Sequence, residues 1–564
     1  MAAEAVVDHG EKEQRKDETA IVVESRDGSL SSQSTTPPPR SSLLLTTIIG
    51  GLCLGTFLFG LDLNILGVAI PPITTEFRSL ADVAWYGSAY MLTLTAFQPL
   101  FGNLYKLFNP KVVYLVSLSI FEVGSIVSAT APNSNALIAG RAILGLGASG
   151  LLQGALSIIG LVVEVDKVPL YIGIVVSSMG FSTCAGPVIG GAITEHIGWR
   201  WCFWINVPSG ALVLLIIYFF VDVSGSPVNQ ASRDLPIRDK IRQIDLLGLV
   251  IFLGAICCLL LALTWGGQAY RWSDGRIISL LVVFGVLMIG LMFWLVRQGE
   301  QALIPLRVLK NRSIYMGSIT LVGYGVLSVV YGYYLPILFQ SIQGVSTTQS
   351  GVRFIALIGP QIVTIVITGA LVSQWGYYVP YAVAGGVICC IGSGFLTTVG
   401  LGTPTAEWAA YLVITGIGLG MAAQIPYTSL QAVLEPEDIP TGNAIAVFAF
   451  HLAGAVGTAI GQTLLISGLQ TAVPHYTNGA VSPEMVIMAG ATGLNAVAGG
   501  DAQLLESLRM AYGEAVRRTI ILGLAGACIA VPASTGMKWL NIKRIAAERK
   551  GDGTKSSTEV ASGV

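Results

Sequence analysis

The chain has few charged side chains for its length. Asp, Glu, Lys and Arg make up 11% of its 564 residues, whereas soluble domains carry roughly 25%. Hydrophobic residues reach 53%, and the mean hydropathy is +0.71. The 31 basic and 32 acidic residues leave a formal net charge of -1, which argues against a nucleic-acid partner. The composition therefore indicates a polytopic, all-α membrane protein whose surroundings are the lipid bilayer.

Signatures of catalysis and metal binding are also missing. The eight cysteines lie almost entirely inside apolar runs and form no CxxC or Cys/His spacing. We interpret them as packing residues. No GxxxxGK[ST] nucleotide loop occurs, and the segments between apolar runs are too short for a catalytic domain. We expect no catalytic residue, no metal, no cofactor and no enzyme activity.

Long apolar runs dominate what is present. A helix needs about 20 apolar residues to cross the hydrocarbon core. Fourteen such segments are predicted, at residues 43–70, 83–105, 112–130, 136–163, 170–193, 201–221, 246–265, 277–296, 314–338, 350–374, 379–400, 407–432, 442–468 and 517–538.

Basic residues between the spans predict the orientation. With the N-terminus inside, the cytoplasmic loops receive most Lys and Arg, and the opposite face receives chiefly Arg78, Arg200, Arg271 and Arg276. Both termini are then cytoplasmic, which requires an even number of spans. We expect a multi-pass protein of the plasma membrane, with the vacuolar membrane as the alternative.

Two basic stretches divide the spans into groups of six, two and six. Two six-helix halves with a substrate site near the midplane are the architecture of major facilitator transporters. The predicted parts are a disordered cytoplasmic tail at 1–42, a first six-helix bundle at 43–222, basic loops with two linker helices at 223–312, a second bundle at 313–540 with an external loop at about 471–514, and a cytoplasmic tail at 541–564.

Four stretches support a family resemblance. They are LDLNILGVAIPPI in the first span, GRAILGLGASG at 140–150, AGPVIGGAITEHIGWRWCFWINVPSG at 185–210 and YYLPILFQSIQGVSTTQSGVR at 333–353. Together they resemble the fourteen-helix drug:proton antiporter family of the major facilitator superfamily, and within it the fungal efflux pumps for toxins and secondary metabolites. The resemblance implies proton-coupled export of small organic compounds by alternating access, and hence a role in drug resistance.

One segment departs from the superfamily pattern. After the second span the superfamily commonly shows Gly-x-Leu-Ala-Asp-Arg-x-Gly-Arg-Lys, and this chain reads GNLYKLFNPK. Lys106 stands where the acid is expected. A gating contact built on that acid is therefore absent or rebuilt.

The GPVIGG stretch is the most specific part of the resemblance. Gly186 and Gly190 lie one helical turn apart and leave a stripe where a neighbouring helix can approach closely. Pro187 removes one backbone hydrogen bond and bends the helix. The resemblance identifies Gly186, Pro187, Gly190 and Gly191 as the antiporter motif, which seals one conformation against proton leak. Plain small-residue packing is the alternative interpretation.

Three ionisable residues lie at membrane depth in the first half. Counted from the predicted external ends, Asp62 and Glu122 are about 12 to 14 Å deep and Arg141 about 6 Å. Such residues are costly in a bilayer and mark functional sites. One Arg cannot neutralise two acids at once, so one acid can carry a proton. We predict that Asp62, Arg141 and Glu122 couple transport to protons; a static Glu122–Arg141 ion pair is the competing interpretation.

Substrate contacts are the least specific part of the sequence. Amides and an aromatic residue that could line the cavity are Gln98, Gln153, Tyr331, Gln340, Gln361 and Gln424. Few fixed charges in such a cavity favour a neutral or amphipathic organic substrate. We interpret His451 as a packing residue and Asp245 as a helix N-cap.

Two other classes of function stay open at this point. One is an importer or facilitator of an iron chelate or another small solute on the same fold. The other is a membrane enzyme or receptor, for which the sequence offers no motif. For the exporter we expect a monomer whose partners are a small organic substrate, protons and the lipid bilayer.

Overall fold

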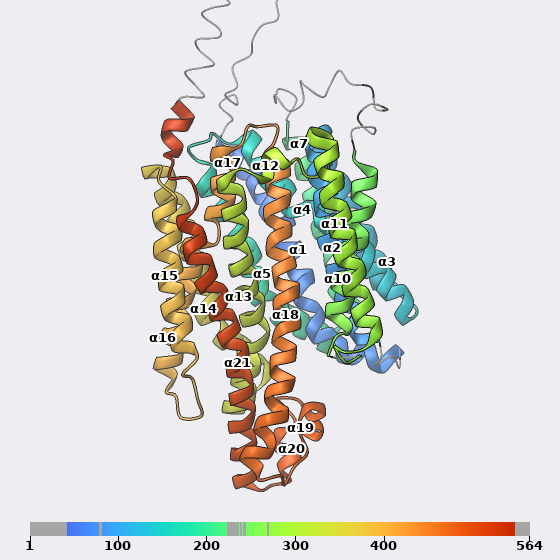
Figure 1. Ribbon diagram of the computed structural model, residues 1–564, viewed down its shortest axis with the longest axis vertical. Helices are drawn as coiled ribbons and strands as arrows, with labels where there is room; N and C mark the ends of the chain where they lie inside the picture. The colour runs from blue at the N-terminus through green and yellow to red at the C-terminus, as the bar shows by residue number, and fades with distance from the viewer. Residues whose placement is uncertain are drawn as a thin grey trace, which may run out of the picture.

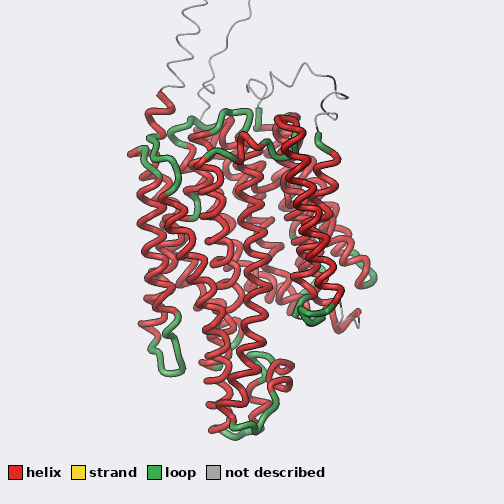
Figure 2. Tube along the Cα trace, in the orientation of Figure 1, coloured by secondary structure: helices red, strands yellow, loops and turns green. Residues whose placement is uncertain are grey.

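The computed structural model describes residues 42–77, 82–222, 236, 238, 240, 244–267 and 270–547. Helices make up nearly all of the described chain (Figure 2). Within these residues the only extended pairings are two isolated bridges, Gly266 with Tyr270 and Tyr377 with Asn541. The predicted all-α class is confirmed.

The first half and the linker contain the following helices: α1 (Ser42–Phe77), α2 (Val83–Leu107), α3 (Pro110–Ala129), α4 (Ser134–Val162), α5 (Val168–His196), α6 (Trp201–Trp204), α7 (Asn206–Phe220), α10 (Leu246–Trp265), α11 (Gly275–Gln298), the 3₁₀ turn η2 (Gly299–Gln301) and α12 (Leu306–Leu309).

The second half contains α13 (Arg312–Gln343), α14 (Thr347–Trp375), α15 (Val379–Leu396), α16 (Thr405–Ala422), α17 (Ile425–Val433), α18 (Ile439–Thr477), α19 (Pro483–Ala489), α20 (Leu494–Ala498) and α21 (Ala502–Thr535). In Figure 1, α12 and α17 lie near one end of the bundle and α19 and α20 at the other. We call these the α17 end and the α19 end.

Every predicted span is helical, but the spans are not equally apolar. Among the described residues, 12 helices are long and apolar enough to cross a membrane, or 13 if the two parts of α5 count as one span. The remaining predicted span is α2, which has 25 residues. Its buried polar side chains, among them Thr95, Gln98 and Asn103, explain its lower apolarity.

Two large apolar cores hold the two halves together internally. The first runs from Ile48 in α1 to Ile217 in α7 and also includes residues of the second half, among them Tyr427 and Ile445. The second joins α13 to α21, from Tyr324 to Ala530. The first core therefore extends across the contact between the two halves.

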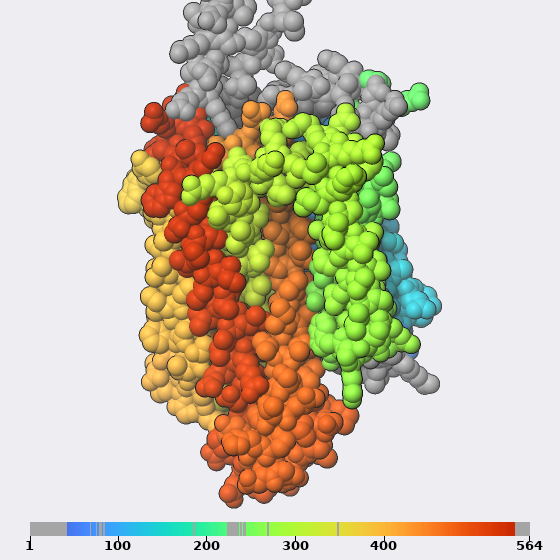
Figure 3. All heavy atoms as spheres, in the orientation of Figure 1, coloured from blue at the N-terminus to red at the C-terminus, as the bar shows by residue number. Residues whose placement is uncertain are grey.

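The linker helices α10 and α11 lie at the edge of the bundle. Their apolar side chains form a small cluster with α2 and with part of α18. Figure 3 shows them (green) on the surface, next to α18 (orange). Asp245 caps α10 as predicted, because its Oδ1 accepts a hydrogen bond of 2.8 Å from the backbone N–H of Gly248. The same carboxylate accepts from the Trp294 indole and from Leu303 N, which fixes α10 to α11.

The segment predicted as an external loop at about 471–514 is mostly helical. The 39-residue α18 continues to Thr477, and the 34-residue α21 begins at Ala502. These two helices extend beyond their neighbours and carry α19 and α20 between them (Figure 1). Buried residues such as Val486, Leu494 and Leu508 belong to the second core. Packing against the long helices therefore keeps this polar stretch helical.

Candidate functional site

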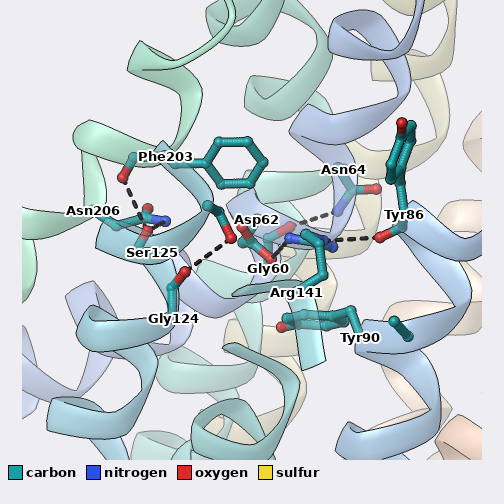
Figure 4. A network of polar contacts seen from close by, with 12 residues as sticks. Gly60, Asp62, Asn64, Tyr86, Tyr90, Gly124, Ser125, Arg141, Phe203 and Asn206 are labelled. Atoms are coloured by element: carbon teal, nitrogen blue, oxygen red, sulfur yellow. Dashed lines mark hydrogen bonds and ion pairs between the residues drawn. The ribbon is translucent and has the colours of Figure 1, made fainter. Parts of the chain in front are cut away.

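The structure joins two of the three predicted ionisable residues directly. Arg141 Nη1 on α4 lies 2.5 Å from Asp62 Oδ2 on α1. Both side chains are almost fully buried, with relative exposures of 2% and 0%. Figure 4 shows the pair between α1, α2 and α4. A buried ion pair costs about 3–5 kcal/mol to break by removing one partner, because the other charge is left uncompensated.

Residues of α2 and α6 hold the guanidinium in place. Arg141 Nε donates to the backbone oxygen of Tyr86 at 2.9 Å. The guanidinium carbon lies 4.5 Å from the centroid of the Tyr90 ring and 5.8 Å from that of Phe203. Cation–π contacts of this kind stabilise a desolvated Arg. The second carboxylate oxygen, Asp62 Oδ1, has no hydrogen-bond partner among the described residues.

Glu122 on α3 lies apart from this pair. Both its carboxyl oxygens are buried and have no hydrogen-bond partner within the part of the chain that the structure describes. The group faces Gly210 on α7, where an added Cβ would lie 1.7 Å from Glu122 Oε1. Arg141 therefore pairs with Asp62 here rather than with Glu122. Any larger residue at position 210 would force the Glu122 carboxyl to move from this position.

The GPVIGG stretch brings α5 against α1. A Cβ on Gly186 would lie 2.7 Å from the Cβ of Asn64, whereas one on Gly191 would meet nothing within 4 Å. Gly190 is buried, and its backbone oxygen accepts from Cys202 at 3.9 Å. Helix α5 bends by 45° between Val168–Thr183 and Val188–His196. The bend includes Pro187, whose side chain lies outside the described residues.

The residues after GPVIGG anchor the end of α1. Arg200 Nη2 lies 2.8 Å from Glu76 Oε1, and the Trp199 indole donates to Glu76 Oε2 at 2.8 Å. Glu76 lies beyond the apolar span of α1, which ends at Gly67. Hydrogen bonds from Arg200 and Trp199 hold the pKa of the Glu76 carboxyl below its usual value. These contacts tie the α5–α6 connection to α1.

Lys106, the residue that departs from the superfamily pattern, makes an ion pair between the two halves. Its Nζ lies 3.2 Å from Asp438 Oδ1, just before α18. Arg307 Nη2 from α12 lies 2.8 Å from Asp438 Oδ2. The Asp438 side chain is 2% exposed, so both cations converge on a buried acid. Neither Asp438 nor Arg307 was predicted as a site residue from the sequence; the acidic run EPED before α18 was the available signal.

Other contacts close the same α17 end. Asn443 Nδ2 lies 3.5 Å from Ser157 Oγ. A Cβ on Gly102 would lie 2.6 Å from the Cβ of Ala444. Gln424 faces α5 from the other half, since its Oε1 would lie 2.7 Å from a Cβ on Gly173. The two halves are thus in close contact at the α17 end.

The residues predicted to line the cavity separate into two groups. Gln98 and Gln424 contact the opposite half, at His451 and at Gly173 of α5, and Gln153 donates to the backbone oxygen of Gln98. The others contact helices of the second half: Tyr331 OH donates to Ile520 O, Gln340 Nε2 donates to Ser350 Oγ, and the backbone of Gln361 lies against Gly416 and Gly420.

One hollow lies away from these residues. Its volume is about 420 Å³, and its walls include Ile193, Trp201, Trp204 and Pro208. Trp201 is 52% exposed, so this hollow opens at the outer surface of α5, α6 and α7. It is apolar and shares no side chain with the Asp62–Arg141 pair.

Comparison with known families agrees with this architecture. The family model described as Major Facilitator Superfamily matches residues 52–458. The chain belongs to the major facilitator superfamily, a family of membrane transporters. It is accordingly a multi-pass membrane protein.

Curated relatives match over nearly the whole chain. The chain is 40% identical over 500 residues to the MFS-type efflux pump MFS1 of Arthroderma benhamiae, covering 88% of this chain and 91% of the relative. It is 38% identical over 497 residues to the efflux pump aflT of Aspergillus parasiticus, covering 88% and 96%. The predicted resemblance to fungal efflux pumps is confirmed.

Solved structures show the same fold at low sequence identity. The proton:xylose symporter XylE matches with a TM-score of 0.57 and 15% identity, covering 90% of this chain and 100% of that chain. The human organic anion transporter MFSD10 matches with a TM-score of 0.54 and 14% identity, covering 87% and 100%. At this level of identity the likeness supports the fold alone.

Proposed function

We propose that this protein exports small organic compounds by exchanging them for protons through alternating access. The observation that carries the proposal is the buried Arg141–Asp62 pair with one carboxylate oxygen left without a partner. A buried carboxylate can change its charge only by taking up a proton, and doing so releases the partner charge. The efflux-pump relatives support the direction of transport.

The geometry suggests how a proton acts on the helices. Protonation of Asp62 removes the attraction that holds Arg141 between α1 and α4. Arg141 then keeps only its bond to Tyr86 O and its ring contacts. Because α1 also packs on α5 at Gly186, a shift of α1 reaches the helix that carries GPVIGG. Glu122, whose carboxyl has no described partner, is the second candidate for holding a proton.

The proposed function also requires two moving halves and a defined orientation in the membrane. Two bundles at 43–222 and 313–540, joined by linker helices at 223–312, form the moving halves, and the tails at 1–42 and 541–564 lie in the cytoplasm. The protein works as a monomer in the plasma membrane, without catalytic activity and without a nucleic-acid partner. The α17 end then faces the cytoplasm, and its close inter-half contacts correspond to a state that is closed on that side.

The experiment is transport in vesicles containing the purified protein, with a panel of labelled compounds and an imposed pH gradient. Asp62→Asn keeps the size and hydrogen bonding of the side chain but cannot change charge. We expect gradient-driven export to be lost while compound binding and exchange persist. Asp274→Asn, at the half-buried N-cap of α11, is the control and should transport normally.

Two outcomes would contradict the proposal. If Asp62→Asn pumps against a gradient with unchanged pH dependence, the proton uses another group, with Glu122 to be tested next. If the pH gradient drives accumulation in the opposite direction, the protein is an importer.

A double variant tests whether Asp62 and Arg141 act together. Arg141→Ala should reduce transport less in the Asp62→Asn background than it does alone, because the effects of residues in one network are not additive.

A further inference from the structure

A cluster of uncharged polar side chains lies where α2, α4 and α18 meet. Gln98 Nε2 lies 2.9 Å from His451 Nδ1. Gln153 Nε2 donates to the backbone oxygen of Gln98 at 3.1 Å. Thr95 lies three residues before Gln98, on the same face of α2. Thr95, Gln98, Gln153 and His451, all at most 5% exposed, form what we call the amide–imidazole cluster.

Each member of the cluster has a buried polar atom with no hydrogen-bond partner among the described residues. These atoms are Thr95 Oγ1, Gln98 Oε1, Gln153 Oε1 and His451 Nε2. An unsatisfied buried group of this kind costs about 1–3 kcal/mol. Packing alone would favour apolar side chains at these positions. A ligand that enters when the halves separate would satisfy them.

The position of the cluster fits a substrate subsite. Gln98 and Gln153 lie nine residues from the ends of α2 and α4, and His451 lies 12 residues into α18. At 1.5 Å per residue these depths are about 14 and 18 Å, close to the bilayer midplane. His451 belongs to the second half, and the other members belong to the first. The cluster therefore comes apart when the halves move.

The surroundings define the chemistry of the ligand. The rings of Phe59 and Phe450 lie edge-on to the imidazole, with centroids 5.8 and 5.5 Å away. No member of the cluster carries a fixed charge, and an ionic ligand without a counter-charge would be expensive at this depth. A neutral aromatic compound is the class that fits.

The hydrogen-bonding pattern points to a hydroxyl group. With Gln98 Nε2 donating to His451 Nδ1, the imidazole proton lies on Nε2, which donates to a ligand while the amide oxygens accept. In the other tautomer Nδ1 donates to Val447 O at 3.0 Å, and Nε2 accepts instead. A hydroxyl both donates and accepts, so it satisfies the cluster in either tautomer.

We propose that the amide–imidazole cluster is the polar subsite of this transporter and recognises a hydroxyl group on a neutral aromatic compound. The inference rests on the proposed export function, and it names the class of compound that is exported.

Matched probes test the subsite by binding, without any pH gradient. The full-length protein in lipid nanodiscs is titrated with 2-naphthol and its methyl ether, and with estrone and its 3-methyl ether. Each ether lacks the hydroxyl donor. We expect the unsubstituted protein to prefer each hydroxyl compound by roughly threefold to tenfold, the value of one hydrogen bond. His451→Phe, Gln98→Leu and Gln153→Leu should remove the preference.

The controls separate this inference from the proton mechanism and from misfolding. His475→Phe, on the same helix but outside the cluster, and Asp62→Asn should both keep the preference. The melting temperature of each cluster variant is measured as a folding control, because each substitution removes one unsatisfied polar atom and also one hydrogen bond of the cluster. Equal or undetectable binding of the probes by the parent protein, or an unchanged preference in all three cluster variants, would overturn the inference. Loss of gradient-driven export in Asp62→Asn bears on the proton proposal alone.

Discussion

The ion pairs on Asp438 should control how tightly the α17 end stays closed. Lys106 belongs to the first half, Asp438 to the second and Arg307 to the linker, so these pairs exist only while the parts are together. Lys106→Met removes one pair and leaves Asp438 with Arg307. Asp438→Asn removes both pairs at once.

The exposed fractions of the basic side chains determine how much free energy each ion pair contributes. The Lys106 side chain is 27% exposed and that of Arg307 54%, so each pair is partly screened by solvent. We assign about 1 kcal/mol to each. Lys106→Met should therefore lower the ratio of closed to open protein by about fivefold, and Asp438→Asn by about thirtyfold. Adding Lys106→Met to Asp438→Asn should change little, because the pair is already lost.

Disulfide cross-linking measures the closed state directly. Ser157 and Asn443 lie in contact across the two halves, so Ser157→Cys with Asn443→Cys, in a chain without its natural cysteines, reports closure. The cross-linked fraction should fall in the order given above. Lys167→Met is the control, since Lys167 pairs with Glu164 three residues away within the same half. Unchanged cross-linking in Asp438→Asn, or an equal loss in Lys167→Met, would refute the reasoning.

Three further predictions concern the motif, the α1 anchor and the orientation. Gly186→Leu should abolish export from a protein that still reaches the membrane, because its Cβ would lie 2.7 Å from the Cβ of Asn64 on α1. Gly191→Ala, the control, should transport normally. Normal transport by Gly186→Leu would show that close packing of α5 on α1 is not required. The lowered pKa of Glu76 means that its contacts stabilise the fold above pH 4.5 and are lost as pH falls through the lowered value. Glu76→Gln should thus lower the melting temperature at pH 7, with a loss of unfolding free energy of no more than about 1 kcal/mol, and this loss should shrink as the pH falls through the lowered pKa. A loss that does not change with pH counts against the ion pair. A tag near Gly499 should be accessible in intact cells and terminal tags protected; the reverse pattern would invert the proposed topology.

The sequence by itself determined the class of protein and the order of its helices. Apolar runs of about 20 residues are dictated by the bilayer, whose core satisfies no exposed backbone group, so their positions could be predicted without contacts. Asp62 and Arg141 were identified for the same reason, since a charge in such a run is costly. Only the tertiary structure decided how these residues pair. Arg141 contacts Asp62 rather than Glu122 because α1, α2 and α4 surround the guanidinium, while Glu122 faces Gly210 on α7.

Contacts between residues far apart in the chain could not be predicted from the sequence. Lys106 and Asp438 are 332 residues apart, and Gln98 and His451 are 353 apart. No local periodicity links such positions, because their contact depends on how helices of the two halves meet. The helices α19 and α20 in the polar stretch at 471–514 likewise depend on packing against α18 and α21, which the sequence does not show. The apolar segments of a membrane protein can be identified from its sequence, whereas the contacts between its halves form only when the helices assemble.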